Sequence, residues 1–260
     1  MNPAPLPEKF PFRPAIVFTD VDETLTWEGR LPPAAFTALV KLQAVGIKVI
    51  PVTGASAGWC DCMIRTWPID SIIGENGSFF INRNQQGQLS HTYALPESER
   101  QLNWQRLQVL KQDVLVRFAH ARETADQSFR KTDIAFDIGQ DWQVERKQAA
   151  IIAEYCSAAG FNAKMSSIHI NVWCGNYSKS AMALRWLDHY QANKKEAIFI
   201  GDSPNDDCMF ASFPVTVGVA NIAPYIAEIR TPPTYLTSQP GGFGFSEMSD
   251  SLLRTEAANE

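Results

Sequence analysis

The sequence has no long apolar run, no excess of positive charge and no even set of cysteines, and each absence excludes a class of protein. Its apolar stretches, such as 15–19 and 198–200, end far short of the roughly 20 residues that cross a bilayer. Lysine and arginine number 23 against 28 aspartates and glutamates, a net charge of −5, so the basic surface of a general nucleic-acid binder is absent. The five cysteines are scattered, and the N-terminus does not resemble a signal peptide. We therefore expect a reduced, cytoplasmic protein that uses neither a membrane nor nucleic acid.

Short apolar segments alternate with helical patterns at both ends of the chain. Strands are predicted at 15–19, 47–53, 71–74, 197–201 and 215–219. Helical patterns lie between them, the last long one running from about Ser178 to Tyr190. This alternation predicts an α/β fold with a Rossmann-like parallel sheet covered by helices on both faces. Residues 1–14 contain five prolines and predict an extended arm.

The pattern changes between residues 84 and 174. Two sets of residues recur at helical spacing: Leu107, Leu110, Val114 and Phe118, then Val144, Gln148, Ile151 and Tyr155. Two further segments, 133–138 and 168–173, alternate apolar and polar residues, which is typical of a sheet with one packed face and one open face. We expect an inserted α+β cap domain at 84–174, and a discontinuous core domain at 15–83 and 175–260.

Acidic pairs follow two of the predicted core strands. Asp20 and Asp22 lie two residues apart at the end of the first strand, so on extended backbone both carboxylates point the same way. Asp202 and Asp206 follow the strand at 197–201. Ligands bind at the carboxyl ends of strands in open α/β sheets, and converging carboxylates suit Mg²⁺. The alternative for the first pair is an ordinary helix cap or turn.

Two other positions could hold an anion. Thr53 and Gly54 end the second strand and offer a hydroxyl and an approachable backbone N–H. Lys179 opens a predicted helix, where a lysine is well placed to neutralise phosphate. Taken alone, Lys179 would be an ordinary surface lysine.

The order and spacing of these segments resemble the haloacid dehalogenase (HAD) superfamily of phosphotransferases. The matching motifs are Asp-Val-Asp-Glu-Thr at 20–24, Thr53, Lys179 and Gly-Asp-Ser-Pro-Asn-Asp at 201–206. The long segment between Thr53 and Lys179, preceded by Gly-Glu-Asn-Gly at 74–77, resembles the C2B cap of the type IIB branch. That branch includes Cof-like phosphatases, sugar-phosphate phosphatases and phosphomannomutases.

The resemblance implies a role for each motif residue. It makes Asp20 the nucleophile that forms an aspartyl-phosphate and Asp22 the general acid/base. It also implies that Thr53, Gly54, Lys179 and Asn205 bind the phosphoryl group, and that Asp20, Asp22 through its backbone carbonyl and Asp202 bind Mg²⁺. We place Asp206 behind these groups, orienting Lys179 or a metal-bound water. A dehalogenase would lack the second acid of the first motif, so Asp22 favours phosphoryl transfer.

The polar phase of the two alternating segments supplies candidates for recognising the leaving group. They are Lys131, Asp133, Asp137, His169, Asn171 and Trp173. The alternative is a solvated sheet face.

Many relatives carry an arginine after the Thr-Gly pair, whereas this chain has Ala55 at that position. Arg65, Arg130 and Lys131 are candidates to supply the missing positive charge. The segment 58–62 contains two cysteines that point apart on a helix, which favours packing over metal binding.

These observations favour a Mg²⁺-dependent phosphatase acting on a small phosphate ester, with a sugar phosphate as the expected substrate. Two alternatives remain open at this point. A hexose phosphomutase would use the same core and cap, and a non-catalytic HAD-like binding protein would keep the fold alone. The sequence leaves the physiological substrate and the oligomeric state undetermined.

Overall fold

The computed structural model describes residues 3–166 and 168–255. The first two residues of the predicted arm and the last five of the chain lie outside the described residues. Residues 3–14 pack on the rest of the chain: β1 (Ala4–Pro5) pairs in parallel with β12 (Tyr235–Leu236), and Phe10 is buried. None of the described helices is long and apolar enough to cross a membrane.

The largest sheet has six parallel strands in the order β1-β12-β11-β10-β2-β3. Its four inner strands are β12, β11 (Thr216–Gly218), β10 (Ala197–Gly201) and β2 (Ile16–Thr19). The edge strands are β1 and β3 (Lys48–Pro51). Every residue of β2 and β10 is buried, which is why both strands read as continuous apolar runs. The predicted parallel α/β fold is confirmed.

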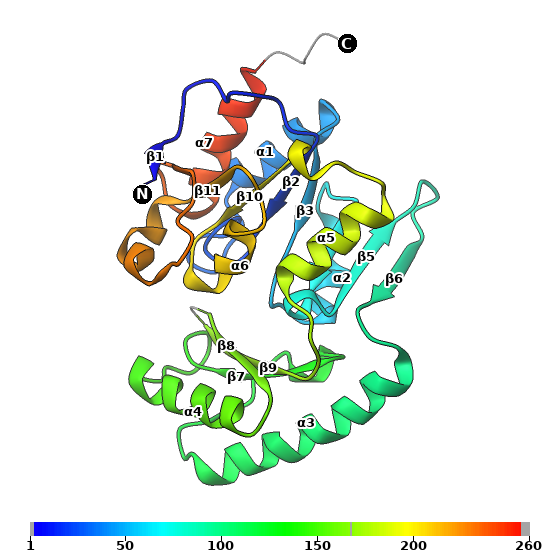
Figure 1. Ribbon diagram of the computed structural model, residues 1–260, viewed down its shortest axis with the longest axis vertical. Helices are drawn as coiled ribbons and strands as arrows, with labels where there is room; N and C mark the ends of the chain where they lie inside the picture. The colour runs from blue at the N-terminus through cyan, green and yellow to red at the C-terminus, as the bar shows by residue number, and fades with distance from the viewer. Residues whose placement is uncertain (1–2, 167, 256–260) are drawn as a thin grey trace.

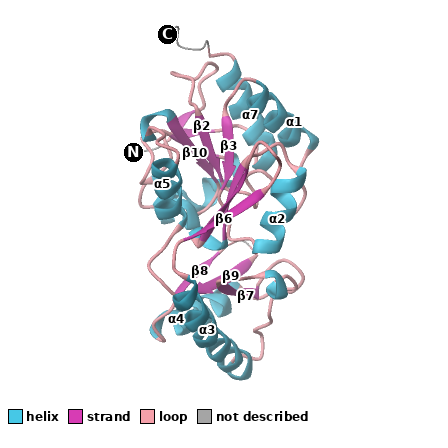
Figure 2. Ribbon diagram, turned by 90° about the vertical axis from the view of Figure 1, so that its right-hand side faces the viewer, coloured by secondary structure: helices cyan, strands magenta, loops and turns pink. Residues whose placement is uncertain are grey.

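Helices cover both faces of this sheet (Figures 1 and 2). One face packs against α1 (Pro33–Ala44), α2 (Ala57–Thr66) and α7 (Gly241–Leu253), and the other against α5 (Lys179–His189) and α6 (Asp207–Phe210). Side chains of β2 alternate between the two layers: Val17 lies in the first cluster, whereas Phe18 lies in the second beside Trp186. The shorter 3-10 turns are Glu75–Gly77, Gln127–Phe129, Lys194–Glu196, Pro204–Asp206 and Ala220–Glu228.

A second sheet continues from the edge of the first. It contains β4 (Ser71–Gly74), β5 (Phe79–Arg83) and β6 (Leu89–Tyr93), all antiparallel. A bridge between Val52 and Ile73 joins β4 to the end of β3. The first strand beyond the predicted boundary at residue 84 therefore pairs with core strands rather than with the insert.

The insert folds around a third sheet, with strand order β7-β9-β8. Its strands are β7 (Asp133–Asp137), β8 (Asn162–Met165) and β9 (His169–Trp173), and its helices are α3 (Glu97–Arg117) and α4 (Arg146–Ala158). Both helices pack on one face of the sheet, and the opposite face turns toward the carboxyl ends of the core strands (Figure 1).

Two expectations for the insert are wrong in detail. The second helix exists, but Ala149, Ile152 and Cys156 form its buried face, while Ile151 is half exposed. Apolar residues occupy adjacent positions there, so the spacing alone does not select the buried stripe. The predicted open sheet face is also wrong: all five residues of β7 and of β9 are buried, because the core covers the polar face.

Candidate active site

Three carboxylates converge at the carboxyl end of the core sheet. Asp20 follows β2 and Asp202 follows β10, and these strands are hydrogen-bonded neighbours. One carboxylate oxygen from each of Asp20, Asp202 and Asp206 lies within 4.8 Å of the others. All three residues are buried. The fold thus brings together acids that are far apart in the sequence.

Lys179 lies among these acids. Its helix begins with Ser178, whose hydroxyl accepts a hydrogen bond from the backbone N–H of Ala181. The Lys179 ammonium donates to Asp20 Oδ1 at 2.7 Å and to Asp206 Oδ1 at 2.8 Å. Lys179 is buried, so it is not the surface lysine of the alternative reading.

A close turn holds the start of α5 in place. Gly77 has φ +98°, and a Cβ there would lie 2.1 Å from the carbonyl oxygen of Ser178. Only glycine allows the backbone of the 75–77 turn to approach the helix that carries Lys179.

Burial and mutual repulsion strongly perturb the acids. Burial, with the charge of Asp206, raises the pKa of Asp20 to about 7, and Lys179 partly offsets both. Burial and the charge of Asp20 also raise the pKa of Asp202, and burial raises that of Asp22. Asp20 and Asp206 hold the pKa of Lys179 above its usual value, although burial acts in the opposite direction. Such a group of carboxylates is stabilised by a cation.

The donor set fits Mg²⁺. Asp202 accepts one long hydrogen bond from a side chain of the described residues, 3.4 Å from Asn221 Nδ2, so its carboxylate retains lone pairs. Asp206 has fewer free lone pairs, because its carboxylate accepts hydrogen bonds from Lys179 and, at 3.2 Å, from the backbone N–H of Asp202. Asp206 is therefore placed to orient Lys179 and the Asp202 loop.

A small cavity of about 20 Å³ opens onto these groups. Asp20, Asp22, Gly54, Lys179, Asp202 and Asn205 all line it. Thr53 lies just behind: it is fully buried, and its hydroxyl oxygen accepts from the backbone N–H of Ala55 at 3.0 Å. His169 and Asn171 close the cavity from the cap side.

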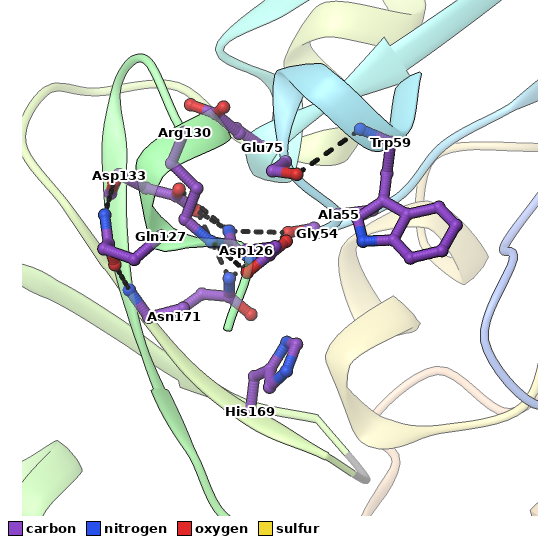
Figure 3. A network of polar contacts seen from close by, with 12 residues as sticks. Gly54, Ala55, Trp59, Glu75, Asp126, Gln127, Arg130, Asp133, His169 and Asn171 are labelled. Atoms are coloured by element: carbon purple, nitrogen blue, oxygen red, sulfur yellow. Dashed lines mark hydrogen bonds and ion pairs between the residues drawn. The ribbon is translucent and has the colours of Figure 1, made fainter. Parts of the chain in front are cut away.

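A buried polar network joins the cap to the Gly54 loop (Figure 3). Arg130 donates to the carbonyl oxygen of Gly54 at 3.0 Å, to Asp133 at 2.9 Å and to Asp126 at 3.2 Å. Asn171 donates to Asp133 at 3.2 Å and to the Gly54 carbonyl at 3.3 Å. Of the arginines considered as substitutes for a basic residue at Ala55, Arg130 thus contacts the Gly54 carbonyl, whereas Arg65 is exposed and pairs with Asp61.

The remaining candidates in the insert make no hydrogen bond to the Gly54 loop among the described residues. Asp137 accepts four backbone N–H groups of the loop at 139–142, His169 Nε2 lies 2.8 Å from Gln140 Oε1, and the Lys131 side chain is exposed. Trp173 is buried beside Tyr177. The alternative of a solvated sheet face is therefore wrong, because the side chains on the two strands are buried and most of them have hydrogen-bond partners, chiefly within the insert.

Glu75 is a central residue that the sequence reasoning missed. It is fully buried and accepts hydrogen bonds from the backbone N–H groups of Ala57, Lys131 and Thr132 and from the Thr132 hydroxyl. Its carboxylate therefore ties α2 to the cap. The signal was its place in the Gly-Glu-Asn-Gly turn, where Glu75, Asn76 and Gly77 all have positive φ.

The two cysteines of segment 58–62 are separated as expected. Cys60 is buried and free, and Cys62 is exposed and free. The Cys60 side chain packs behind Gly74, where an added Cβ would lie 2.6 Å from its sulfur. Packing is the role of Cys60.

Comparisons with known proteins agree with this architecture. Residues 119–232 match the family model of the haloacid dehalogenase-like hydrolases. A solved protein of Thermoplasma acidophilum is similar, with 17% identity and a TM-score of 0.73 over 93% of this chain and 98% of that one. The sucrose-phosphatase of Synechocystis, solved with sucrose and phosphate, has 14% identity and a TM-score of 0.66 over 93% and 98% of the two chains.

A third similar structure is a subclass IIB sugar phosphatase of the HAD superfamily, with 13% identity and a TM-score of 0.63 over 92% of this chain and 98% of that one. No curated protein sequence matches the chain. At such low identity the solved structures establish the fold, and the family model adds a similarity to hydrolases over residues 119–232. Over residues 119–232 the chain is therefore similar to the haloacid dehalogenase-like hydrolases, and its fold is that of the solved structures.

Proposed function

We propose that this hydrolase is a Mg²⁺-dependent phosphatase that forms an aspartyl-phosphate on Asp20. The observation that carries the proposal is the small cavity in which Asp20, Asp22, Lys179 and Asp202 face one another. A buried nucleophile, a cation and a second acid at one strand end are the groups that phosphoryl transfer requires.

Asp20 has one oxygen held and one available. Lys179 fixes Oδ1, and Oδ2 accepts no hydrogen bond from the described residues. In the first step Oδ2 attacks phosphorus, the bond from phosphorus to the ester oxygen breaks, and Asp22 donates a proton to the leaving oxygen. In the second step Asp22 removes a proton from water, the water oxygen attacks phosphorus, and the bond to Asp20 breaks to release phosphate. Proton transfer by a positioned acid contributes roughly 10²–10⁴-fold.

Thr53, Gly54, Lys179 and Asn205 are the proposed phosphoryl ligands. Gly54 and Asn205 line the cavity from opposite loops, and Lys179 brings the positive charge. Mg²⁺ would be held by Asp20, the backbone carbonyl of Asp22 and Asp202. It would screen the phosphoryl charge from Asp20.

The proposed substrate is a small phosphate ester, namely a sugar phosphate. Support comes from the buried polar face of the cap, which covers the site, and from the sucrose-phosphatase and the sugar phosphatase among the similar structures. We also propose that 15–83 and 175–260 form the core domain and 84–174 the cap domain, with β6 (Leu89–Tyr93) pairing with the core strand β5 across that boundary. Arg130 and Glu75 link the two.

The test is hydrolysis of p-nitrophenyl phosphate with Mg²⁺ by the wild type and by Asp20→Asn. The variant should lose at least a thousandfold in kcat, because its amide is a far weaker nucleophile than a carboxylate. Asp70→Asn, the same change at an exposed position, should keep wild-type activity. Chelation of divalent cations should abolish activity, and Mg²⁺ should restore it. Turnover retained by a folded Asp20→Asn protein would contradict the mechanism.

A further inference from the structure

Two larger cavities flank the small one, and they touch different parts of it. One, of about 620 Å³, shares Asp22 and His169 with the small cavity; we call it the aromatic cleft. The other, of about 610 Å³, shares Ser166, Asp202, Ser203 and Asn205 with it and does not reach Asp22. A leaving oxygen that takes its proton from Asp22 directs its substituent into the aromatic cleft.

The walls of the aromatic cleft come from α2 and the loop after β2. Trp59, Met63 and Trp67 line one side and Leu31 another. The Trp59 side chain points away from the polar network (Figure 3), and half of its surface is exposed. An exposed indole facing a cavity offers a flat apolar surface on which a ring can stack.

The charged lining of the aromatic cleft has one sign. Asp22, Glu23, Glu28 and Asp126 line it, whereas no lysine or arginine does so among the described residues; Arg30, next to Gly29, is not part of the lining. Glu23 and Glu28 have φ near +58° and +50°. Non-glycine residues persist in this region only where the surroundings impose it, so the loop holds both acids at the rim.

Arg130, which contacts the lining residue Asp126, is already paired, and His169, which lines the cleft, is uncharged. Arg130 is buried between Asp126 and Asp133. Burial lowers the pKa of His169 to about 4, so its ring is neutral at pH 7. Lys164 and Arg146 line the other large cavity, not this one.

We propose that the aromatic cleft binds the leaving group and selects an uncharged hydroxylated one, such as a sugar or polyol, while rejecting one that carries a second anionic group. This inference rests on the proposed phosphatase function. Hydroxyl groups can donate to Glu23, Asp126 and Gln140 while the ring packs on Trp59. A second phosphate or a carboxylate would instead meet the carboxylates of Glu23 and Glu28, with no lysine or arginine among the described lining residues to offset them. The cleft therefore disfavours the phosphomutase alternative, which needs a second phosphate site.

The first test compares esters that differ by one anionic group. kcat/KM is measured for glucose 6-phosphate against 6-phosphogluconate, and for glycerol 3-phosphate against 3-phosphoglycerate. The uncharged leaving group should be preferred at least tenfold in each pair. The cationic leaving group of glucosamine 6-phosphate should be accepted at least as well as that of glucose 6-phosphate. The preference should shrink at high salt, which screens charges at the open rim.

The second test changes the lining. Glu28→Lys should reduce the preference for glucose 6-phosphate over 6-phosphogluconate at least threefold. Glu154→Lys, the same change on the exposed side of α4, should leave it unaltered, as should Lys164→Glu in the other cavity. Trp59→Ala should raise KM for glucose 6-phosphate about fivefold or more with little change in kcat, and Trp59→Phe should restore most of the loss.

The outcomes separate this inference from the proposed function. If no variant and no wild-type protein hydrolyses p-nitrophenyl phosphate, the phosphatase itself fails. If that ester is hydrolysed but the anionic member of each pair is used equally well, the inference about the cleft fails. It also fails if p-nitrophenyl phosphate is hydrolysed and no uncharged sugar or polyol phosphate is, or if Lys164→Glu alone changes the preference.

Discussion

Two buried groups of charge lie a short distance apart in this protein, and they are built differently. The first is the cluster that we propose as catalytic, called the catalytic cluster below, and it consists of Asp20, Asp202, Asp206 and Lys179. The junction network consists of Glu75, Asp126, Arg130, Asp133 and Asn171, between core and cap (Figure 3). Each contains three acids and one cation.

The difference lies in how many hydrogen bonds the acids accept. In the junction network Glu75 is held by three backbone N–H groups and a hydroxyl, and Asp133 by Arg130 and Asn171. In the catalytic cluster Asp202 accepts one long side-chain bond, and one oxygen of Asp20 accepts none from the described residues. Buried acids that are satisfied stabilise a fold, whereas those left open to a cavity can bind and react.

The largest effect is expected in the junction network. Arg130→Met should lower the free energy of unfolding by about 3–5 kcal/mol, because it leaves the fully buried Asp133 and the partly buried Asp126 without their cation. Urea denaturation measures the loss. The matched change Arg65→Met, in the exposed pair with Asp61, should alter stability little. Equal effects of the two variants would show that Arg130 is not a structural link.

A smaller effect is expected at His169, where the network meets the small cavity. Burial lowers its pKa to about 4 from an unfolded value near 6.5, so the unfolded chain binds more protons between these values. The contribution of His169 to stability is therefore fully present above pH 6.5 and is lost as the pH drops toward 4, by up to ~3 kcal/mol. Asp20, whose pKa is raised, contributes with the opposite sign over this range, so the His169 contribution is read from the difference between wild type and variant.

His169→Gln should remove this pH dependence while keeping a partner for Gln140. The measurement is the difference in unfolding free energy between pH 6.5 and 4.5 for wild type and variant. His120→Gln, at an exposed position, serves as the control and should behave like the wild type. Parallel curves for wild type and His169→Gln would rule out a buried neutral imidazole.

The smallest effect should have the opposite sign and arise in the catalytic cluster. Without divalent cations, Asp202→Asn should raise the free energy of unfolding by about 1 kcal/mol, since burial and Asp20 both oppose its charge. With Mg²⁺ at 100 times its dissociation constant, the wild type should gain about 2.7 kcal/mol, and the variant less.

The order of the melting temperatures should therefore reverse on adding Mg²⁺. Thermal unfolding with and without the ion measures this, and Asp70→Asn should follow the wild type in both conditions. A variant destabilised in both conditions would mean that Asp202 holds the fold as the junction acids do.

The catalytic cluster was the more predictable of the two. Asp20, Lys179 and Asp202 follow strand ends or begin a helix, and the parallel order of neighbouring strands is enough to bring such positions to one edge. Local sequence carries this information because buried strands and helix starts have recognisable patterns.

The junction network depends on how core and cap pack, which periodicity does not contain. Alternation in β7 and β9 identified Asp133 and Asn171 as one face, yet it could not show that the core covers them. Glu75 lies in a turn and Arg130 in a loop, and such segments have no regular spacing of apolar and polar residues from which burial could be predicted. The buried stripe of α4 was misplaced by one residue for a related reason, since two adjacent faces of that helix are apolar.

The strand order has a consequence for how the protein is made. β2 lies between β3 and β10, so the central sheet needs segments from both sides of the insert. The ion pair between Asp20 and Lys179 joins residues that are 159 positions apart in the chain. At roughly 5–20 residues per second, the ribosome takes on the order of ten seconds to synthesise that interval. β2, which precedes the proposed nucleophile Asp20, therefore remains unpaired on one edge until the segment that contains β10 emerges, and it is open to chaperone binding or aggregation during synthesis.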